Sequence, residues 1–412
     1  MPSAPALSDQ PPAMHKPQYV LPEGVAFTGN AAAFISLYLA AGAPVPLLVH
    51  YQQQWHFDAP ELAWAFAVYA AGFLGALLTV GSLSDHVGRR PVLLGALLIQ
   101  LAALVAFLVA DDIGVVIAAR VVQGIATGAA TSTFAAALVE LAPAHRKKLG
   151  TILGSVGMAG GLAVGALLSG VAIEFVPRPG VLIFTVLAAI TVLGIAVAAF
   201  TRDGGQRMPG ALRSLLPQAA VPPAVRREFI AAAPAIAAAW MVGGLSLGLA
   251  PSIIRTVFQL DSGLLNGFSS FIGPAAAAVA GLALAGTAAR KGLILGIVAA
   301  AAGMAGMLAG IAGGSLGVMI AGQVIGGLGF GAAFTAALRL IIPLAPAQER
   351  GGVVASLYIV AYLAFSVPVI LVGQLAAPLG LVPALVTYGA ATVLLCAVSL
   401  VNQLAPRSRA AA

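Results

Sequence analysis

A short loop near residue 85 places one carboxylate among arginines and glycines. It reads Gly81-Ser82-Leu83-Ser84-Asp85-His86-Val87-Gly88-Arg89-Arg90. A carboxylate beside arginines can form an ion pair and change partners when the surrounding helices move. The same arginines could also do no more than anchor a neighbouring helix at a membrane surface. The loop therefore indicates either a switchable ion pair or a simple anchor.

A second polar feature is a stripe inside an apolar segment. Arg120, Gln123, Thr127 and Thr131 are spaced i, i+3, i+7 and i+11, which puts them on one face of an α-helix. An arginine inside a membrane costs about 2.5–3.5 kcal/mol on insertion scales, so it normally faces a cavity or a partner. Alternatively, its side chain extends to the nearby membrane surface. The amide and the hydroxyls on the same face favour a wet cavity.

The composition requires that most of the protein surface faces lipid. The chain has 412 residues, of which 60% are hydrophobic and only 8% are charged, and its mean hydropathy is +1.03. Soluble domains carry about 25% charged residues, so a soluble enzyme or a secreted domain is excluded. A single cysteine, Cys396, excludes intramolecular disulfides and thiolate metal sites.

The apolar runs predict an all-α polytopic membrane protein with 12 transmembrane helices. Each run is long enough to cross about 30 Å of hydrocarbon, and none shows the alternation of a barrel strand. The predicted spans are 25–49, 62–82, 91–110, 113–139, 149–173, 179–200, 229–253, 264–287, 292–312, 315–341, 352–375 and 381–403.

The basic residues distinguish the two sides of the predicted membrane protein. Nearly all of the 20 Lys and Arg fall on the side that carries both termini, and outside the spans only Arg178 and Arg255 fall on the opposite side. Because positive residues stay in the cytoplasm during insertion, we expect a multi-pass protein of the cytoplasmic (inner) membrane with both termini cytoplasmic. The same asymmetry accounts for the net charge of +7, so no nucleic-acid partner is expected.

The chain also divides into two similar halves. Leu141-Ala142-Pro143-Ala144 recurs as Leu344-Ala345-Pro346-Ala347, and a polar stretch rich in arginine and proline separates the halves. Six-helix repeats of the same orientation imply two bundles with a site between them. We expect a disordered cytoplasmic tail over 1–22, bundles over 23–200 and 229–404, a cytoplasmic linker over 201–228 and a cytoplasmic tail over 405–412.

The loop at residues 81–90 resembles the major facilitator superfamily, whose signature there is G-x-L-[AS]-D-[RK]-x-G-R-[RK]. Every fixed position agrees except His86, where the family prefers a basic residue. The resemblance covers residues 25–403 at the level of the fold and implies two pseudo-symmetric bundles. It also implies that the loop latches the cytoplasmic side in one state. We favour this latch over a simple membrane anchor, because an anchor needs neither Asp85 nor Gly88. The latch residues would be Gly81, Asp85, Gly88, Arg89 and Arg90.

Two further elements resemble the superfamily. The stretch beginning at Arg120 is similar to its R-x-x-Q-G-x-x-x-G element, whose arginine is associated with proton coupling. Gly157, Gly161 and Gly165 resemble the antiporter element of its drug and metabolite exporters, which ends G-x-x-x-G-P-x-x-G-G. Ala166 replaces the proline of that element, so its distortion of the helix is lost. The glycines by themselves favour ordinary close packing of helices.

The 13 acidic residues avoid the middle of every predicted span. Exporters of cationic drugs generally need a buried carboxylate that exchanges a proton for the cation. For this role the chain offers only Asp85, Glu140 near the inner end of span four and Glu174 at the outer end of span five. We therefore expect a neutral, zwitterionic or anionic solute, with positive potential from Arg120 and, as a second candidate, Arg339.

The resemblance implies that spans one, four, seven and ten line a central cavity, and span eleven adds a half-polar stripe. A hydrogen bond between helices would explain each of these side chains equally well. The candidate cavity residues are Asn30, Tyr38, Gln123, Thr127, Trp240, Gln323, Arg339, Tyr358 and Tyr362.

These features predict a secondary active transporter that works by alternating access, and not an enzyme. Our first hypothesis is proton-coupled efflux of a drug or metabolite, as in the superfamily's antiporters, with Arg120 and Asp85 as coupling residues. The alternatives are a proton-coupled importer of an organic anion or small metabolite, and a membrane sensor that transports nothing. We expect no catalytic residue, no metal and no cofactor beyond a proton gradient. The expected partners are a small-molecule substrate, protons and the lipid bilayer, with the protein as a monomer.

Overall fold

The computed structural model describes residues 20–143, 147–203, 208–217 and 219–405. Within these ranges the chain forms helices and no strand, and 12 helical segments are long and apolar enough to cross a membrane. The predicted all-α polytopic fold is confirmed. The predicted tail over 1–22 and the tail over 405–412 lie almost entirely outside the described residues.

Each half of the chain contributes six membrane-crossing segments. The first half contains α1 (Glu23–Gly42), α2 (Pro44–Trp55), α3 (Ala59–Val80), the short α4 (Ser84–Val87), α5 (Arg89–Leu108), α6 (Ile113–Leu141), α7 (Lys147–Phe175) and α8 (Pro179–Phe200). The linker carries the short α9 (Ala211–Ser214). The second half contains α10 (Pro223–Gly244), the π-turn η2 (Leu245–Leu249), α11 (Ala250–Thr256), α12 (Gly263–Ala283), α13 (Ala289–Ala312), α14 (Leu316–Ile341), the 3₁₀ turns η3 (Ile342–Leu344) and η4 (Ala347–Glu349), α15 (Arg350–Leu379) and α16 (Leu381–Leu404).

The first and seventh spans are longer than predicted because their prolines lie where a helix tolerates them. The first span continues to Trp55, since Pro44 occupies the first turn of α2, where no backbone N–H is needed. The seventh begins at Pro223 and continues through η2 to Thr256. Helix α10 therefore starts six residues before position 229, where the seventh span was predicted to begin.

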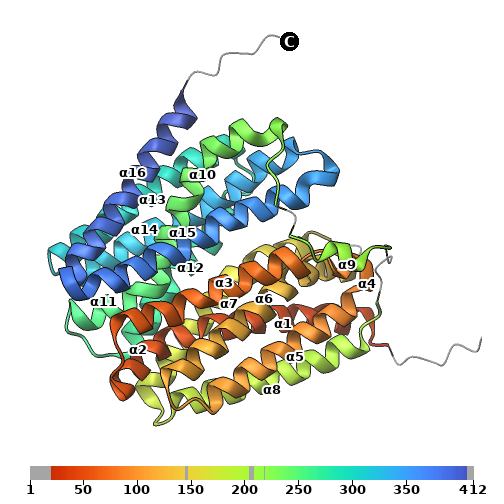
Figure 1. Ribbon diagram of the computed structural model, residues 1–412, viewed down its shortest axis with the longest axis horizontal. Helices are drawn as coiled ribbons and strands as arrows, with labels where there is room; N and C mark the ends of the chain where they lie inside the picture. Colours follow the sequence, from red (N-terminus) through yellow and green to blue (C-terminus); the bar gives the residue numbers. More distant parts are fainter. Residues whose placement is uncertain (1–19, 144–146, 204–207, 218, 406–412) are drawn as a thin grey trace, which may run out of the picture.

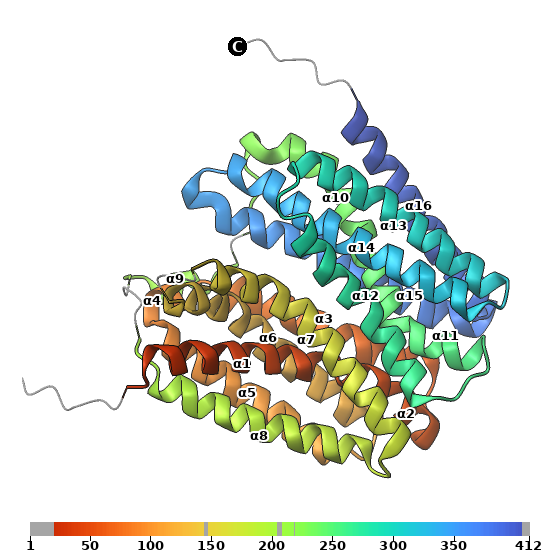
Figure 2. The same ribbon diagram turned by 180° about the vertical axis from the view of Figure 1, so that it is seen from behind.

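The two bundles lie side by side and diverge toward one face of the molecule. We call the face that bears the start of α1, the short α4 and α9 and the end of α16 the terminal face, and the opposite one the distal face. Figure 1 shows the bundles meeting near α2 and α11, at the distal face, and separating toward α4 and α9. The reverse view in Figure 2 shows the same divergence between α7 and α12.

At the distal face, helices from the two bundles meet through glycines. A Cβ atom placed on Gly170 of α7 would lie 2.5 Å from the carbonyl oxygen of Gly263 at the start of α12. A Cβ on Gly373 of α15 would lie 2.5 Å from the Cβ of Ala63 on α3. Only glycine permits backbones to approach this closely, so these crossings hold the bundles together at the distal face.

Polar contacts reinforce this distal closure. The Gln53 amide donates to the Asp261 carboxylate at 2.9 Å. The Ser262 hydroxyl donates to the Glu174 carboxylate at 3.1 Å. Each contact joins one bundle to the other.

Inside the first bundle, the glycines of the predicted antiporter element pack α7 onto α1. A Cβ on Gly161 would lie 2.6 Å from the Cβ of Tyr38, and one on Gly165 would lie 2.1 Å from the Leu39 carbonyl oxygen. Gly157 faces the ring of Phe34. Their position thus gives each of the three glycines a packing role.

Candidate functional site

A cavity of about 700 Å³ lies between the bundles. Its walls come from α1–α3, α6 and α7 on one side and from α10, η2, α12, α14 and α15 on the other. It extends from Arg120 in α6 to Val139 and Leu338, near the terminal ends of their helices. This volume falls within the range of small-molecule sites, which is about 300–1,000 Å³. We call it the central cavity.

Arg120 is buried in the wall of the central cavity and is held by neutral groups. Its Nη1 donates to the Gln123 side chain at 2.6 Å and to the Ala41 carbonyl at 3.1 Å, while Nε donates to the Ala65 carbonyl at 3.2 Å. The guanidinium carbon lies 4.5 Å from the centre of the Tyr69 ring, a cation–π distance. These contacts fix the orientation of the guanidinium without neutralising its charge.

No carboxylate among the described residues lines the central cavity, and Arg120 is its one ionised side chain there. The hydrogen bonds of Arg120 to described residues use Nε and Nη1. A buried cation without a counter-ion is costly, so a ligand that brings an acceptor or a negative charge gains strongly from it. The cavity is therefore electrostatically suited to acceptor-rich or anionic solutes.

The rest of the wall is aromatic and aliphatic. Trp240 lies within 5.7 Å of the ring centres of Phe330, Phe334, Tyr362 and Phe365. Its indole Nε1 is buried and has no hydrogen-bond partner among the described residues. An indole N–H is only a donor, so the second uncommitted polar group of the cavity also favours an acceptor on the ligand.

Arg120, Trp240, Tyr358 and Tyr362 are the predicted residues that line the cavity. The other predicted side chains lie elsewhere and bond to nearby groups. Tyr38 bonds Thr131, Asn30 donates to Thr201 and Ala26, Gln123 donates to the Ala40 carbonyl, Thr127 donates to the Gln123 carbonyl, Gln323 donates to the Ser269 carbonyl, and Arg339 donates to the Leu284 and Thr287 carbonyls. In the structure, each of these six side chains therefore forms hydrogen bonds to neighbouring groups of the protein, which was the alternative to lining the cavity.

Sequence reasoning missed the aromatic lining. Phe66 and Tyr69 of α3, Phe330 and Phe334 of α14, and Phe365 of α15 all face the cavity. Their helical spacing of three and four residues was a signal, but lipid-facing aromatics in a membrane helix show the same spacing. Residue type alone does not distinguish the two surroundings.

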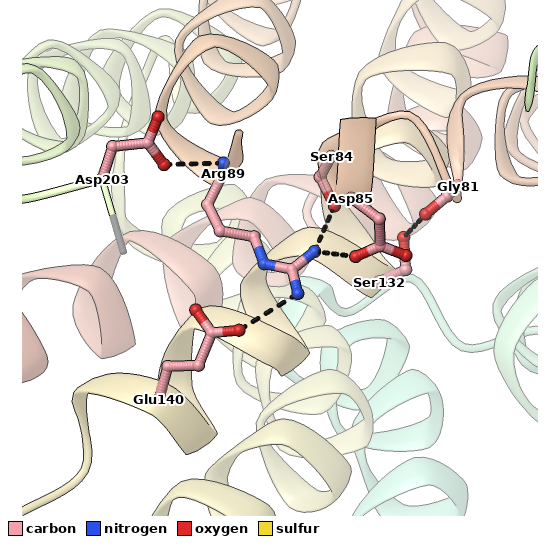
Figure 3. A network of polar contacts seen from close by, with 7 residues as sticks. All are labelled: Gly81, Ser84, Asp85, Arg89, Ser132, Glu140 and Asp203. Atoms are coloured by element: carbon pink, nitrogen blue, oxygen red, sulfur yellow. Dashed lines mark hydrogen bonds and ion pairs between the residues drawn. The ribbon is translucent and has the colours of Figure 1, made fainter. Parts of the chain in front are cut away.

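The residues of the predicted latch form a charged network at the terminal face (Figure 3). Arg89 Nη1 contacts the Asp85 carboxylate at 2.5 Å and Nη2 contacts the Glu140 carboxylate at 3.0 Å. Ser84 accepts a further hydrogen bond from Nη1 at 2.7 Å. One guanidinium thus bridges the loop after α3 and the end of α6. Arg90, the second arginine of the loop, lines a separate pocket beside Glu140.

The linker closes the network from the other side. Asp203 accepts the backbone N–H of Arg89 at 3.0 Å, and the backbone N–H of Met208 donates to the Asp85 carbonyl at 3.1 Å. Gly88 has a φ of +101°, and a Cβ there would fall within 2.2 Å of the Asp203 carboxylate. Gly81 contributes its carbonyl oxygen, which accepts from Ser132 at 2.7 Å (Figure 3). The partners named here all belong to the first bundle or to the linker.

The comparison with known families is decisive. Residues 31–292, more than half of the chain, match the Major Facilitator Superfamily. The chain belongs to this superfamily. It is therefore a membrane transporter, as the signature loop predicted.

The relatives of this superfamily transporter are distant. An uncharacterized MFS-type transporter of Mycobacterium tuberculosis is 28% identical over 144 residues, which make up 34% of this chain and 24% of that protein. A crystal structure of a mutant of the peptide transporter POT, in complex with alafosfalin, has a TM-score of 0.74 at 15% identity and covers 92% of this chain and 94% of its own.

A bacterial homolog of the human lysosomal transporter Spinster, in an inward-facing and unoccupied conformation, has a TM-score of 0.72 at 12% identity. The alignment covers 94% of this chain and 98% of that one. At these identities the solved structures share the fold of this transporter.

Proposed function

We propose that this transporter exports small organic solutes that are neutral, zwitterionic or anionic, and that it exchanges them for protons. The observation that carries the proposal is the buried guanidinium of Arg120, which faces an aromatic cavity with no carboxylate among the described residues. Aromatic walls accommodate an apolar body, and the cation attracts an acceptor or an anionic group.

The proposal assigns the terminal face to the cytoplasm, because nearly all lysines and arginines outside the spans fall on that side. With the distal contacts closed and the cavity extending toward the terminal face, this state would load a solute from the cytoplasm. Rocking of the bundles would then open the distal side and release the solute outside the cell.

Coupling would involve Asp85 as well as Arg120. Protonation of Asp85 removes the negative charge that holds Arg89, and the guanidinium then retains Glu140 as its carboxylate partner. Such a change loosens the loop after α3 from the start of α5, which allows the latch to exchange partners between states.

Everted membrane vesicles with an acidic lumen test this function. We expect them to accumulate naphthalene-1-sulfonate, a permanent anion, and Arg120→Ala to abolish the accumulation. An uncharged aromatic amide tests the neutral class, and tetraphenylphosphonium tests the cationic one. If tetraphenylphosphonium proved to be the only solute transported, the assignment of solute class would be wrong.

A proton-coupled importer of organic anions is the second candidate, and the uncompensated charge of Arg120 favours it equally. The direction of flux separates the two. An importer would accumulate the sulfonate in right-side-out vesicles with an acidic exterior, and everted vesicles with an acidic lumen would not accumulate it.

A further inference from the structure

A second cavity lies between the bundles on the distal side of the first. It has a volume of about 470 Å³, and its walls come from α2, α3, η2, α11 and α15. Asp58 and Ala59, which are exposed at the distal surface, form part of its rim. We call it the distal vestibule. It is large enough for a small molecule and is reached from the side opposite to the central cavity.

The ring of Phe66 stands between the two cavities. Phe66 lines both of them and is itself buried. Its ring centre lies 5.0 Å from that of Phe365, across the junction of the bundles. A Cβ placed on Gly248 would lie 2.6 Å from the Phe66 ring, so the ring rests directly on the backbone of η2.

The π-turn explains how this contact arises. In η2 the extra residue shifts the helix face, so that Leu247 lines the central cavity while Gly248 and Leu249 line the vestibule. Single π-turns inside α-helices occur frequently at functional sites. In η2 the Leu247 side chain faces the central cavity. The backbone of Gly248, which has no side chain, lies against the Phe66 ring beside the vestibule.

Like the central cavity, the vestibule contains a guanidinium, and its rim also carries the Asp58 carboxylate. Arg255 of α11 lines it and donates from Nη1 to the Val49 carbonyl at 3.1 Å, as Arg120 Nη1 donates to the Ala41 carbonyl at 3.1 Å. The two carbonyls belong to one membrane span and lie about 12 Å apart along it, at 1.5 Å per residue. Neither guanidinium forms an ion pair with a described carboxylate.

A buried hydroxyl without a hydrogen-bond partner among the described residues also indicates that the vestibule binds a ligand. The Ser252 hydroxyl lines the vestibule, is buried and has no hydrogen-bond partner among the described residues. Asp58 is the carboxylate on the rim, and it forms a capping box with Glu61 at the start of α3. The remaining walls are mainly aliphatic, with Leu48 and Val369 as examples.

We infer that the distal vestibule is a second binding site for organic anions with an apolar body, separated from the central cavity by a gate of Phe66 and Gly248. The inference rests on the proposed function, because a transported anion would pass from the guanidinium of Arg120 to that of Arg255. The vestibule holds the anion after the gate opens and before release at the distal face.

Equilibrium binding to the purified full-length protein counts the sites. We expect two molecules of radiolabelled naphthalene-1-sulfonate per chain, displaced by unlabelled sulfonate and bound far more weakly as the neutral sulfonamide. Arg255→Gln should weaken one site by about tenfold, the effect of losing one charge-assisted hydrogen bond, and leave the other unchanged. Arg178→Gln is the matched control, since it removes the other distal arginine, which lies exposed outside the vestibule.

The outcomes separate this inference from the proposed function. If the protein binds one sulfonate, and Arg120→Gln abolishes this binding whereas Arg255→Gln does not, the vestibule is not a binding site and the proposed function stands. If instead Arg255→Gln abolishes the binding and Arg120→Gln does not, the vestibule is a binding site and the solute class assigned to the central cavity is wrong. Absence of any sulfonate binding overturns the inference.

A leak assay tests the gate without any solute. Proteoliposomes that contain the parent protein should hold an imposed pH gradient, whereas Phe66→Ala should dissipate it because both cavities then join into one path. Phe66→Leu should leak less, since it keeps most of the bulk. A monodisperse size-exclusion profile and a helical circular-dichroism spectrum show that the variants fold, and an undiminished pH gradient in such a folded Phe66→Ala protein excludes the gate.

Discussion

At the scale of the residue, Arg120 shows how a membrane helix can hold a charge without a counter-ion. Its planar fork reaches three acceptors in different directions, two backbone carbonyls and the Gln123 amide oxygen, and the Tyr69 ring covers one face. A lysine would carry the same charge on a compact ammonium that cannot span this geometry. The function of the residue therefore depends on shape as well as on charge.

We expect Arg120→Lys to lower the flux of an anionic solute by about tenfold or more, because one or more charge-assisted hydrogen bonds are lost. The residual flux should exceed that of Arg120→Ala, which removes the charge. Initial rates in proteoliposomes give the comparison. Arg339→Gln is the control, because Arg339 is exposed and donates to carbonyls away from the cavity. Equal flux in the Lys and Ala variants would contradict a role for the charge.

Gly88 supports a second prediction at this scale. With a φ of +101° and the Asp203 carboxylate beside it, an alanine at this position is strained, by about 1–3 kcal/mol for the backbone alone. Gly88→Ala should therefore lower the midpoint of thermal unfolding of the purified protein. Gly95→Ala, in α5 with no atom within 4 Å of the new Cβ, should leave the midpoint unchanged or raise it. Similar midpoints for both variants would argue against strain at Gly88.

Polar side chains could be identified from the sequence, but their surroundings could not. Arg120 and Trp240 face the cavity as predicted, whereas Asn30 and Gln323 are equally polar and equally buried and instead bond to neighbouring groups. Each of these two amides donates to a neighbouring group, as it could to a ligand, so residue type does not reveal which arrangement occurs. Phe66 was missed for the opposite reason, because an apolar ring suits lipid and cavity alike.

At the scale of the element, α7 and α12 form a close crossing between the bundles. The backbones of Gly170, Gly263 and Gly267 meet there with no room for a side chain. The number of spans followed from hydropathy alone. Which glycines meet each other depends on the tertiary arrangement, and the sequence carries no direct signal for it.

We expect Gly170→Val to disfavour the state closed at the distal face. Its side chain would collide with the backbone of α12, so the distal ends of the bundles must separate. Spin labels on the distal ends of α7 and α12 should report a longer mean distance, and flux should fall. The control is Gly160→Val, which makes the same substitution in the same helix. A Cβ at Gly160 has no atom within 4 Å, so we expect no change in the distance. An unchanged distance in Gly170→Val would show that this crossing does not control closure.

At the scale of the whole molecule, the two faces differ in how the bundles are connected. Side chains and backbones of both bundles meet at the distal face, through Gln53 and Asp261 among others. The described contacts of Arg89 at the terminal face all lie within the first bundle and the linker. The two-bundle division was predicted from the repeat, but which face is closed is a property of one conformational state and has no signature in the sequence.

A covalent tether at the distal face should arrest transport, because alternating access requires these ends to separate. Gln53 and Asp261 are 2.9 Å apart between their side-chain atoms, so a Gln53→Cys, Asp261→Cys pair in a Cys396→Ala background can be bridged by a short bifunctional thiol reagent. We expect the bridged protein to lose flux and to regain it when a cleavable reagent is reduced.

The matched control is a Glu228→Cys, Arg290→Cys pair, whose parent side chains lie 3.3 Å apart within the second bundle. Bridging that pair leaves the bundles free to move and should preserve flux. Full flux in the distally bridged protein would mean that the bundles do not rock about the central cavity, and the transport scheme would have to be replaced.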